Sequence, residues 1–184
     1  MSSSPPPPQQ RPLGILQLNT TFARPPGDVS HPASWPFPIK VAVVGPATQE
    51  AIVGCCWSED LILAFVRAGR RLIEEEGCVA LVTSCGLLAS AHLQLASHLP
   101  SIGTSALVQL PTLAALYPEP GAVGVLTFRE KSLSIKHFCS VRSPFRFLPE
   151  YLCVPCSAFR MDSPLDRLLP PVSLLSFSNL PVMS

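Results

Sequence analysis

Apolar runs rich in β-branched residues alternate with amphipathic segments through residues 13–138 of the chain. Four of these runs predict strands, namely residues 13–19, 39–44, 78–82 and 122–127, with a shorter one near Ile102. Continuous apolar runs of this length are typical of strands that are buried in a parallel sheet. We therefore expect one parallel sheet that carries the segments near Leu16, Val43, Val79 and Val125.

The segments between these runs have the spacing of helices. Ser58 followed by Glu59 and Asp60 predicts an N-cap and an acidic first turn, and Gly77 predicts the end of that helix. Its apolar side recurs at helical spacing through Leu61, Phe65, Ala68 and Leu72. Further helices are expected from Gly86 onward and over residues 105–116. A succession of strand, helix and strand favours the α/β class, with helices on both faces of a parallel sheet.

The character of the chain changes after Phe138. All ten glycines lie at or before Gly124, and the segment after Phe138 is rich in proline, serine, phenylalanine and leucine without a helical period. We therefore divide the chain into four parts: a disordered Pro/Ser/Gln-rich lead (1–12), a first α/β lobe (13–104), the start of a second α/β lobe (105–138), and a divergent, irregular tail (139–184).

Composition excludes several classes of function. The net charge is +1 and there is no basic stripe, so nucleic acid is not an expected partner. The uncharged stretch 77–118 is interrupted by His92, Gln94, His98, Pro100 and Pro111, too often for the roughly 20 apolar residues of a membrane span.

The first residues do not have the pattern of a secretory signal, so we expect a cytoplasmic location. An incomplete second lobe would expose a strand edge and apolar helix faces, which invite association, so a homo-oligomer is also expected as a possible state.

The seven cysteines do not have the spacing of a disulfide framework, and a reducing compartment would keep them as thiols. The pair Cys55-Cys56 suggests no role. The C-x-x-C spacing of Cys153 and Cys156 occurs in zinc half-sites and redox pairs, but no second half-site completes it. We therefore expect no metal site.

Thr83-Ser84-Cys85-Gly86 is the segment most indicative of chemistry, because Cys85 follows a predicted strand and precedes a predicted helix. Ligands of open α/β sheets bind beyond the carboxyl ends of the strands, and helix N-termini favour a thiolate. This position predicts a reactive thiol with a lowered pKa. The alternative interpretation is that Cys85 is buried and acts as a small hydrophobic residue, as free cysteines usually do.

Five motifs in order resemble a known family. They are Leu13-Gly14-Ile15-Leu16 running into Asn19-Thr20, Arg24-Pro25-Pro26-Gly27-Asp28, His31-Pro32-Ala33-Ser34-Trp35, Thr83-Ser84-Cys85-Gly86, and Val123-Gly124-Val125-Leu126-Thr127. Together they resemble the aspartate/glutamate/hydantoin racemase superfamily, in its aspartate/glutamate racemase-like branch, over about residues 13–138. The resemblance implies two similar α/β lobes with the substrate between them, and cofactor-independent chemistry at the α-carbon of an acid.

In that family two cysteines face opposite sides of the substrate, and Cys85 matches the first of them. Inversion of a stereocentre needs one group to remove a proton and another to return one from the opposite face. The second cysteine would belong to the second lobe, where the tail no longer matches, so none of Cys139, Cys153 and Cys156 is assigned that role. Donors for the substrate carboxylate are expected after the strands, at Asn19, Thr20, Thr83, Ser84, Thr104 and Thr127. Each of these could instead be a cap or turn residue.

Three interpretations of function follow. The first is an isomerase acting at the α-carbon of an amino acid or related carboxylic acid, with Cys85 as one acid/base. The second is an inactive, C-terminally truncated family member. The third is a single-cysteine lyase that decarboxylates and protonates a malonate-type acid.

Overall fold

The computed structural model of the chain describes residues 10–53, 57–119, 122–127, 132–141 and 152–155. The chain divides into two compact units, Met1–Ser105 and Ala106–Ser184. None of the helices within the described ranges has the length and apolar character of a membrane span.

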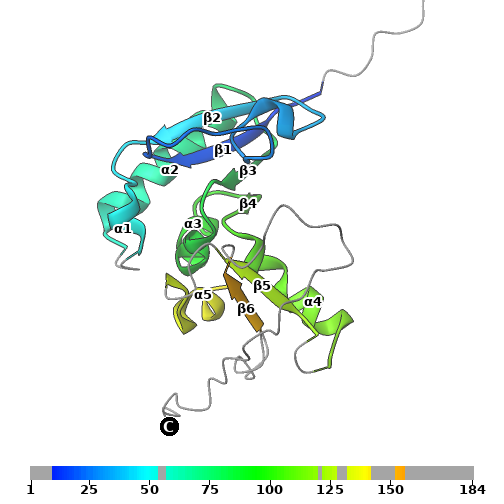
Figure 1. The fold of residues 1–184 in the computed structure, drawn as a ribbon. Coiled ribbons are helices and arrows are strands. Elements are labelled where there is room, and N and C mark those ends of the chain that lie inside the picture. The colour runs from blue at the N-terminus through cyan, green and yellow to red at the C-terminus, as the bar shows by residue number, and fades with distance from the viewer. Residues whose placement is uncertain (1–9, 54–56, 120–121, 128–131, 142–151, 156–184) are drawn as a thin grey trace, which may run out of the picture. The chain divides into compact units, whose positions relative to one another are not determined.

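The first unit is built on a four-stranded parallel sheet of order β2-β1-β3-β4 (Figure 1). Its strands are β1 (Leu13–Leu18), β2 (Ile39–Val44), β3 (Ala80–Thr83) and β4 (Ile102–Gly103). Its α-helices are α1 (Gln49–Val53), α2 (Glu59–Glu74) and α3 (His92–Ala96), and 3-10 turns cover Pro32–Ser34 and Gly86–Ala91. The predicted α/β class with a parallel sheet is confirmed.

Helix α2 covers one face of β1 and β2. The Ser58 side chain accepts a hydrogen bond from Leu61 N, so it is the predicted N-cap. Just beyond the helix, Gly77 has a φ of 69°, a left-handed conformation that glycine adopts without strain. The side chains that point between α2 and the sheet form the core of this unit, and they include Leu16, Leu18, Ala42, Val44, Phe65 and Leu72. On the other face of β2, Val41 and Val43 are 40% and 55% exposed, so over this strand the described residues do not provide the helical cover expected on both faces.

The second unit contains a separate two-stranded parallel sheet formed by β5 (Gly124–Thr127) and β6 (Leu152–Pro155). Its described helices are a 3-10 turn (Ala106–Gln109), α4 (Leu110–Leu116) and α5 (Ile135–Cys139). The prediction that Val125 belongs to the same sheet as Leu16 was therefore wrong, because β5 pairs with β6. Strand β6 also lies within the tail that was expected to be irregular. The pairing of a four-residue segment depends on its partner, and composition alone does not reveal that partner.

The helix expected from Gly86 is a 3-10 turn that continues into α3. No side chain caps it at Cys85, and the segment has neither acidic residues in its first turn nor basic residues in its last. Without these features the α-helical geometry is not strongly favoured at its start.

Helix α2 approaches the sheet closely at Gly69, and this contact yields a stability prediction. A Cβ at Gly69 would lie 2.7 Å from Leu99 Cδ1 and 3.0 Å from Leu81 Cδ1, and both leucines are buried. Overpacking costs about 1–3 kcal/mol, whereas the helix-propensity gain of alanine over glycine is at most about 1 kcal/mol. We expect Gly69→Ala to lower the free energy of unfolding by about 1 kcal/mol in urea titration.

Gly45→Ala is the matched control, because no heavy atom lies within 4 Å of the position that a Cβ would take there. We expect that variant to unfold at the same urea concentration as the parent chain. Equal stability of the Gly69 and Gly45 variants would contradict the close packing described for α2.

Candidate functional site

The Cys85 turn is fastened to the end of β1. Strands β1 and β3 are parallel neighbours with Leu16 opposite Thr83. Ser84 N donates to Leu16 O at 3.1 Å, and Leu18 N donates to Ser84 Oγ at 3.0 Å. Since Cys85 is the next residue, these two hydrogen bonds place it at the carboxyl ends of β1 and β3, as predicted. The Ser84 hydroxyl accepts this bond from the backbone, so it holds the turn in place.

Thr83 and Thr104 connect the same turn to the end of β4. Thr83 Oγ1 donates to Thr104 O at 2.6 Å and lies 3.2 Å from Cys85 O. Thr104 is fully buried, and its hydroxyl lies 3.0 Å from Nδ1 of His92. Burial lowers the pKa of His92, which favours the neutral imidazole at this contact. These polar groups form a network that fixes the backbone around Cys85.

Of the residues that follow β1, Asn19 contacts the loop after β2 and Thr20 makes a contact within its own loop. Asn19 Nδ2 donates to Gly45 O at 2.9 Å, and Thr20 Oγ1 accepts a hydrogen bond from Nη2 of Arg24 at 2.8 Å. Of the predicted carboxylate donors, the structure thus places Asn19, Thr20, Thr83, Ser84 and Thr104 at the carboxyl ends of strands in the first unit. Thr127 ends β5 in the second unit. Substrate binding by any of them stays a prediction.

Arg24 is a residue of this region that the sequence analysis quoted only as part of a motif. Its Nη1 lies 3.2 Å from Oδ2 and 3.3 Å from Oδ1 of Asp28, and its Cζ lies 4.5 Å from the centre of the Phe22 ring. The spacing of four residues between a basic and an acidic side chain was the available signal. This spacing did not single out Arg24 as a site residue, because pairs at this spacing are common on exposed helices. The Arg24–Asp28 pair lies in a loop instead.

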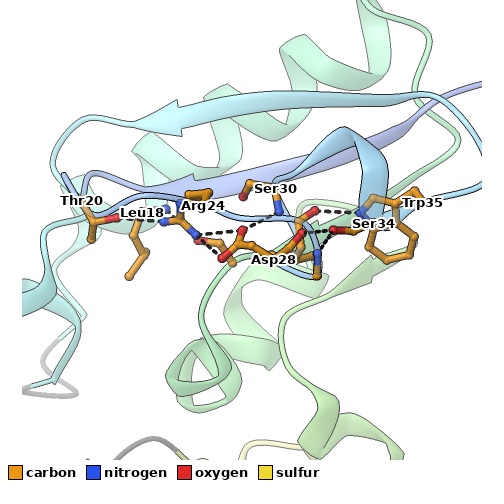
Figure 2. A network of polar contacts seen from close by, with 10 residues as sticks. Leu18, Thr20, Arg24, Asp28, Ser30, Ser34 and Trp35 are labelled. Carbon is orange, nitrogen blue, oxygen red and sulfur yellow. Dashed lines mark hydrogen bonds and ion pairs between the residues drawn. The ribbon is translucent and has the colours of Figure 1, made fainter. Parts of the chain in front are cut away.

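The loop that carries Arg24 is held by a chain of polar contacts (Figure 2). Asp28 Oδ1 accepts from Ser30 N at 2.8 Å, and Asp28 O accepts from Ser34 Oγ at 2.6 Å. Ser34 Oγ in turn accepts from Gly27 N, where the φ of 101° suits glycine, and Trp35 Nε1 donates to Val29 O. Side-chain contacts of this kind let a long loop keep one conformation.

Two polar atoms in the Arg24 loop are buried without a hydrogen-bond partner among the described residues. They are Nε of Arg24 and Oγ of Ser30. Buried polar groups are nearly always paired, so an unpaired one calls for a physical explanation. Arg24 therefore retains an unpaired donor in spite of its ion pair with Asp28.

The Cys85 thiol is half-buried, and burial raises its pKa. The backbone N–H groups of Leu87 and Leu88 and the positive charge of Arg24 lower this pKa only in part. The expectation of a lowered pKa was therefore wrong for the free protein. Removing water from around the sulfur destabilises the thiolate by more than a short 3-10 turn and one cation stabilise it.

No three His, Cys, Asp or Glu side chains are grouped to hold a metal ion within the ranges that the structure describes. Cys55, Cys56 and Cys156 lie outside those ranges.

The first unit is thus an α/β lobe that carries the Cys85 thiol at the carboxyl end of its sheet. A comparison with curated proteins finds similarity to dimethylsulfoniopropionate lyase 5 of Emiliania huxleyi (strain CCMP1516), with 31% identity over 127 residues. The match covers 67% of this chain and 25% of that protein, so the chain spans about a quarter of the length of its curated relative. No protein-family model matches the chain, and no solved structure matches it.

The two described thiols give a test of this site. We expect iodoacetamide to modify Cys85 faster than Cys78, because Cys78 is only 1% exposed. Only the thiolate reacts, and burial raises the pKa of the Cys85 thiol, so its rate should keep rising with pH well beyond neutrality. Peptide mapping by mass spectrometry after timed labelling measures both rates.

The control is the same chain in concentrated urea, where both thiols are exposed and should react alike. A rate at Cys85 that levels off below about pH 8 would contradict a raised pKa, since an ordinary thiol has a pKa of about 8.5.

Proposed function

We propose that the chain is a cofactor-independent enzyme that moves a proton at the α-carbon of an amino acid or related carboxylic acid, with Cys85 as the acid/base. The observation that carries this proposal is the position of Cys85, which Ser84 fastens to β1 at the carboxyl end of the parallel sheet. Small ligands of open α/β sheets bind at this edge. Three of the motifs that resemble aspartate/glutamate racemase-like proteins follow β1 or lie at the end of β3 in the same unit, namely residues 24–28, 31–35 and 83–86.

The chemistry is a reversible proton transfer. The Cys85 thiolate takes the proton from the carbon, the electron pair of the C–H bond moves into the enolate of the substrate carboxyl group, and the thiol then returns a proton to the carbon. The raised pKa of Cys85 suits a group that must accept a proton from a weakly acidic carbon and donate it again. Hydrogen-bond donors at the strand ends would stabilise the negative charge on the carboxyl oxygens.

Inversion of configuration needs a second acid on the opposite face of the carbon. The first unit offers Cys85 at the carboxyl end of its sheet, and no second cysteine of the chain matches the family pattern. We therefore assign the chain one of the two proton-transfer groups. One thiol is sufficient for exchange of the α-proton with solvent on a single face.

A lyase reaction is a second candidate, and similarity to a dimethylsulfoniopropionate lyase favours it. Elimination from a 3-sulfoniopropionate also begins at the carbon beside the carboxylate. A base removes that proton, the C–H electrons form the double bond, and the C–S electrons leave with the sulfide. Because the carbon that loses the proton is planar in the product and receives no proton back, a single thiolate satisfies this reaction.

Proton exchange tests the main proposal. Purified chain is incubated in deuterium oxide with L-aspartate, L-glutamate or a 5-substituted hydantoin, and the α-proton is followed by NMR. We expect Cys85-dependent loss of the α-proton signal with retained configuration, because the label enters from the side of the departing proton. Cys85→Ala should abolish exchange, whereas Cys78→Ala, which changes a thiol outside the site, should leave it intact.

Chiral chromatography of the recovered acid distinguishes the alternatives. Inversion would show that another group supplies the second proton. Absence of exchange with every substrate would overturn the main proposal and favour the inactive family member.

The lyase candidate predicts release of dimethyl sulfide from dimethylsulfoniopropionate, measured by gas chromatography of the headspace. The release above that of buffer should rise with pH as the thiolate forms, and Cys85→Ala should reduce the release to the buffer rate. Equal release by Cys85→Ala and the parent chain would eliminate Cys85 as the base of this reaction.

A further inference from the structure

The Arg24 guanidinium is joined to the end of β1 that carries the Cys85 turn. Nη2 of Arg24 donates to Thr20 Oγ1 at 2.8 Å, and Thr20 lies two residues beyond Leu18. Leu18 N donates to Ser84 Oγ, and Ser84 precedes Cys85. A short path along hydrogen bonds and the chain therefore connects the cation with the residue next to the thiol.

Arg24 is fixed on three sides. Thr20 accepts from Nη2, Asp28 contacts Nη1, and the Phe22 ring lies against the guanidinium with Cζ 4.5 Å from its centre. The side chain is 13% exposed. A charge held in this way does not reorganise when a nearby group ionises, so its field acts in full on that group. It is also shielded from salt better than an exposed cation would be.

The charge of Arg24 is only partly balanced by its carboxylate partner. Both Asp28 oxygens contact the same nitrogen, at 3.2 and 3.3 Å, so the pair lacks the two parallel bonds of the strongest arginine–carboxylate contacts. Asp28 also accepts from Ser30 N. The Nε–H group of Arg24 is buried without a partner among the described residues. Positive charge thus persists on the side of the guanidinium away from Asp28.

We propose that Arg24 is a positioning residue for Cys85: its fixed positive charge at the carboxyl ends of β1 and β3 favours the thiolate during proton transfer. This role deepens the proposed function, and as far as turnover is concerned it rests on that function. The direction of the charge effect agrees, since Arg24 lowers the pKa of Cys85 against the effect of burial. Asp28 keeps the cation in place and cancels part of its field.

The test measures the rate of iodoacetamide alkylation at Cys85 against pH, a property that does not depend on any substrate. Removing the cation in Arg24→Met should slow alkylation at pH 8 on the order of threefold and move the profile to higher pH. Arg24→Lys keeps the charge and should recover most of the rate. Asp28→Asn cuts the same ion pair but removes a negative charge and retains an acceptor for Ser30 N, so it should not slow Cys85.

Lys40→Met is the matched control for loss of a cation. Lys40 pairs with Glu76 at 2.8 Å near Cys78, and it contributes to lowering the pKa of Cys78. We expect this variant to leave the rate at Cys85 unchanged. Cys78 also reports whether each variant is folded, because loss of the core would make this buried thiol react quickly. If Arg24→Met unfolds, the comparison of Arg24→Lys with Asp28→Asn completes the test.

Two outcomes overturn the proposal. If Arg24→Met and Asp28→Asn slow alkylation of Cys85 equally, the ion pair acts only by holding the loop in its conformation. If the pH dependence of alkylation at Cys85 is unchanged in folded Arg24→Met, the charge of Arg24 does not affect the thiol. The proton-exchange assay on the parent chain is read separately. If alkylation follows the predicted pattern but no exchange occurs, the Arg24 role stands and the proposed function fails. If exchange occurs but alkylation does not follow that pattern, the proposed function stands and the Arg24 role fails.

Discussion

The hydrogen bonds between Ser84 and β1 are the constraint on which the rest of the candidate site depends. Ser84 N donates a hydrogen bond to Leu16 O, and Ser84 Oγ accepts one from Leu18 N. The backbone and side chain of this one residue therefore extend the β1–β3 pairing beyond the last residue of β3. Parallel strands end on the same side of a sheet. The loop after β1 and the Cys85 turn are therefore neighbours although they are remote in sequence, and Arg24 can act on the thiol.

Burial and charge act in opposite directions on Cys85. The thiol is half-buried, and the loss of water around it raises its pKa, while Leu87 and Leu88 N–H groups and Arg24 oppose that effect. Burial prevails because its effect on the Cys85 pKa is the largest of these, and the two N–H groups and one cation offset it only in part. The result is a thiol that ionises with difficulty in the free protein, and whose ionisation is sensitive to each nearby charge.

The division into two units bears on which reactions the chain can perform. The first unit holds Cys85 and the loops that follow β1 and β3, and Thr127 lies in the second. Both proposed reactions can begin with the one thiol assigned as the acid/base. Proton removal beside a carboxylate is common to racemisation and to elimination, so the two candidates share their first step and differ in what leaves afterwards.

The sequence by itself determined the local features of the first unit. Apolar runs predicted β1 and β2 within a residue, Ser58 and Gly77 predicted the limits of α2, and the change from strand to turn marked Cys85. Only the tertiary structure decided which strands pair, that β5 and β6 form a separate sheet, and that the Ser84 and Thr83 hydroxyls bond to the backbone. It also reversed the expected direction of the Cys85 pKa. The physical reason is that periodicity and capping act between residues close in sequence, whereas strand pairing, desolvation and the field of Arg24 depend on distances that folding alone establishes.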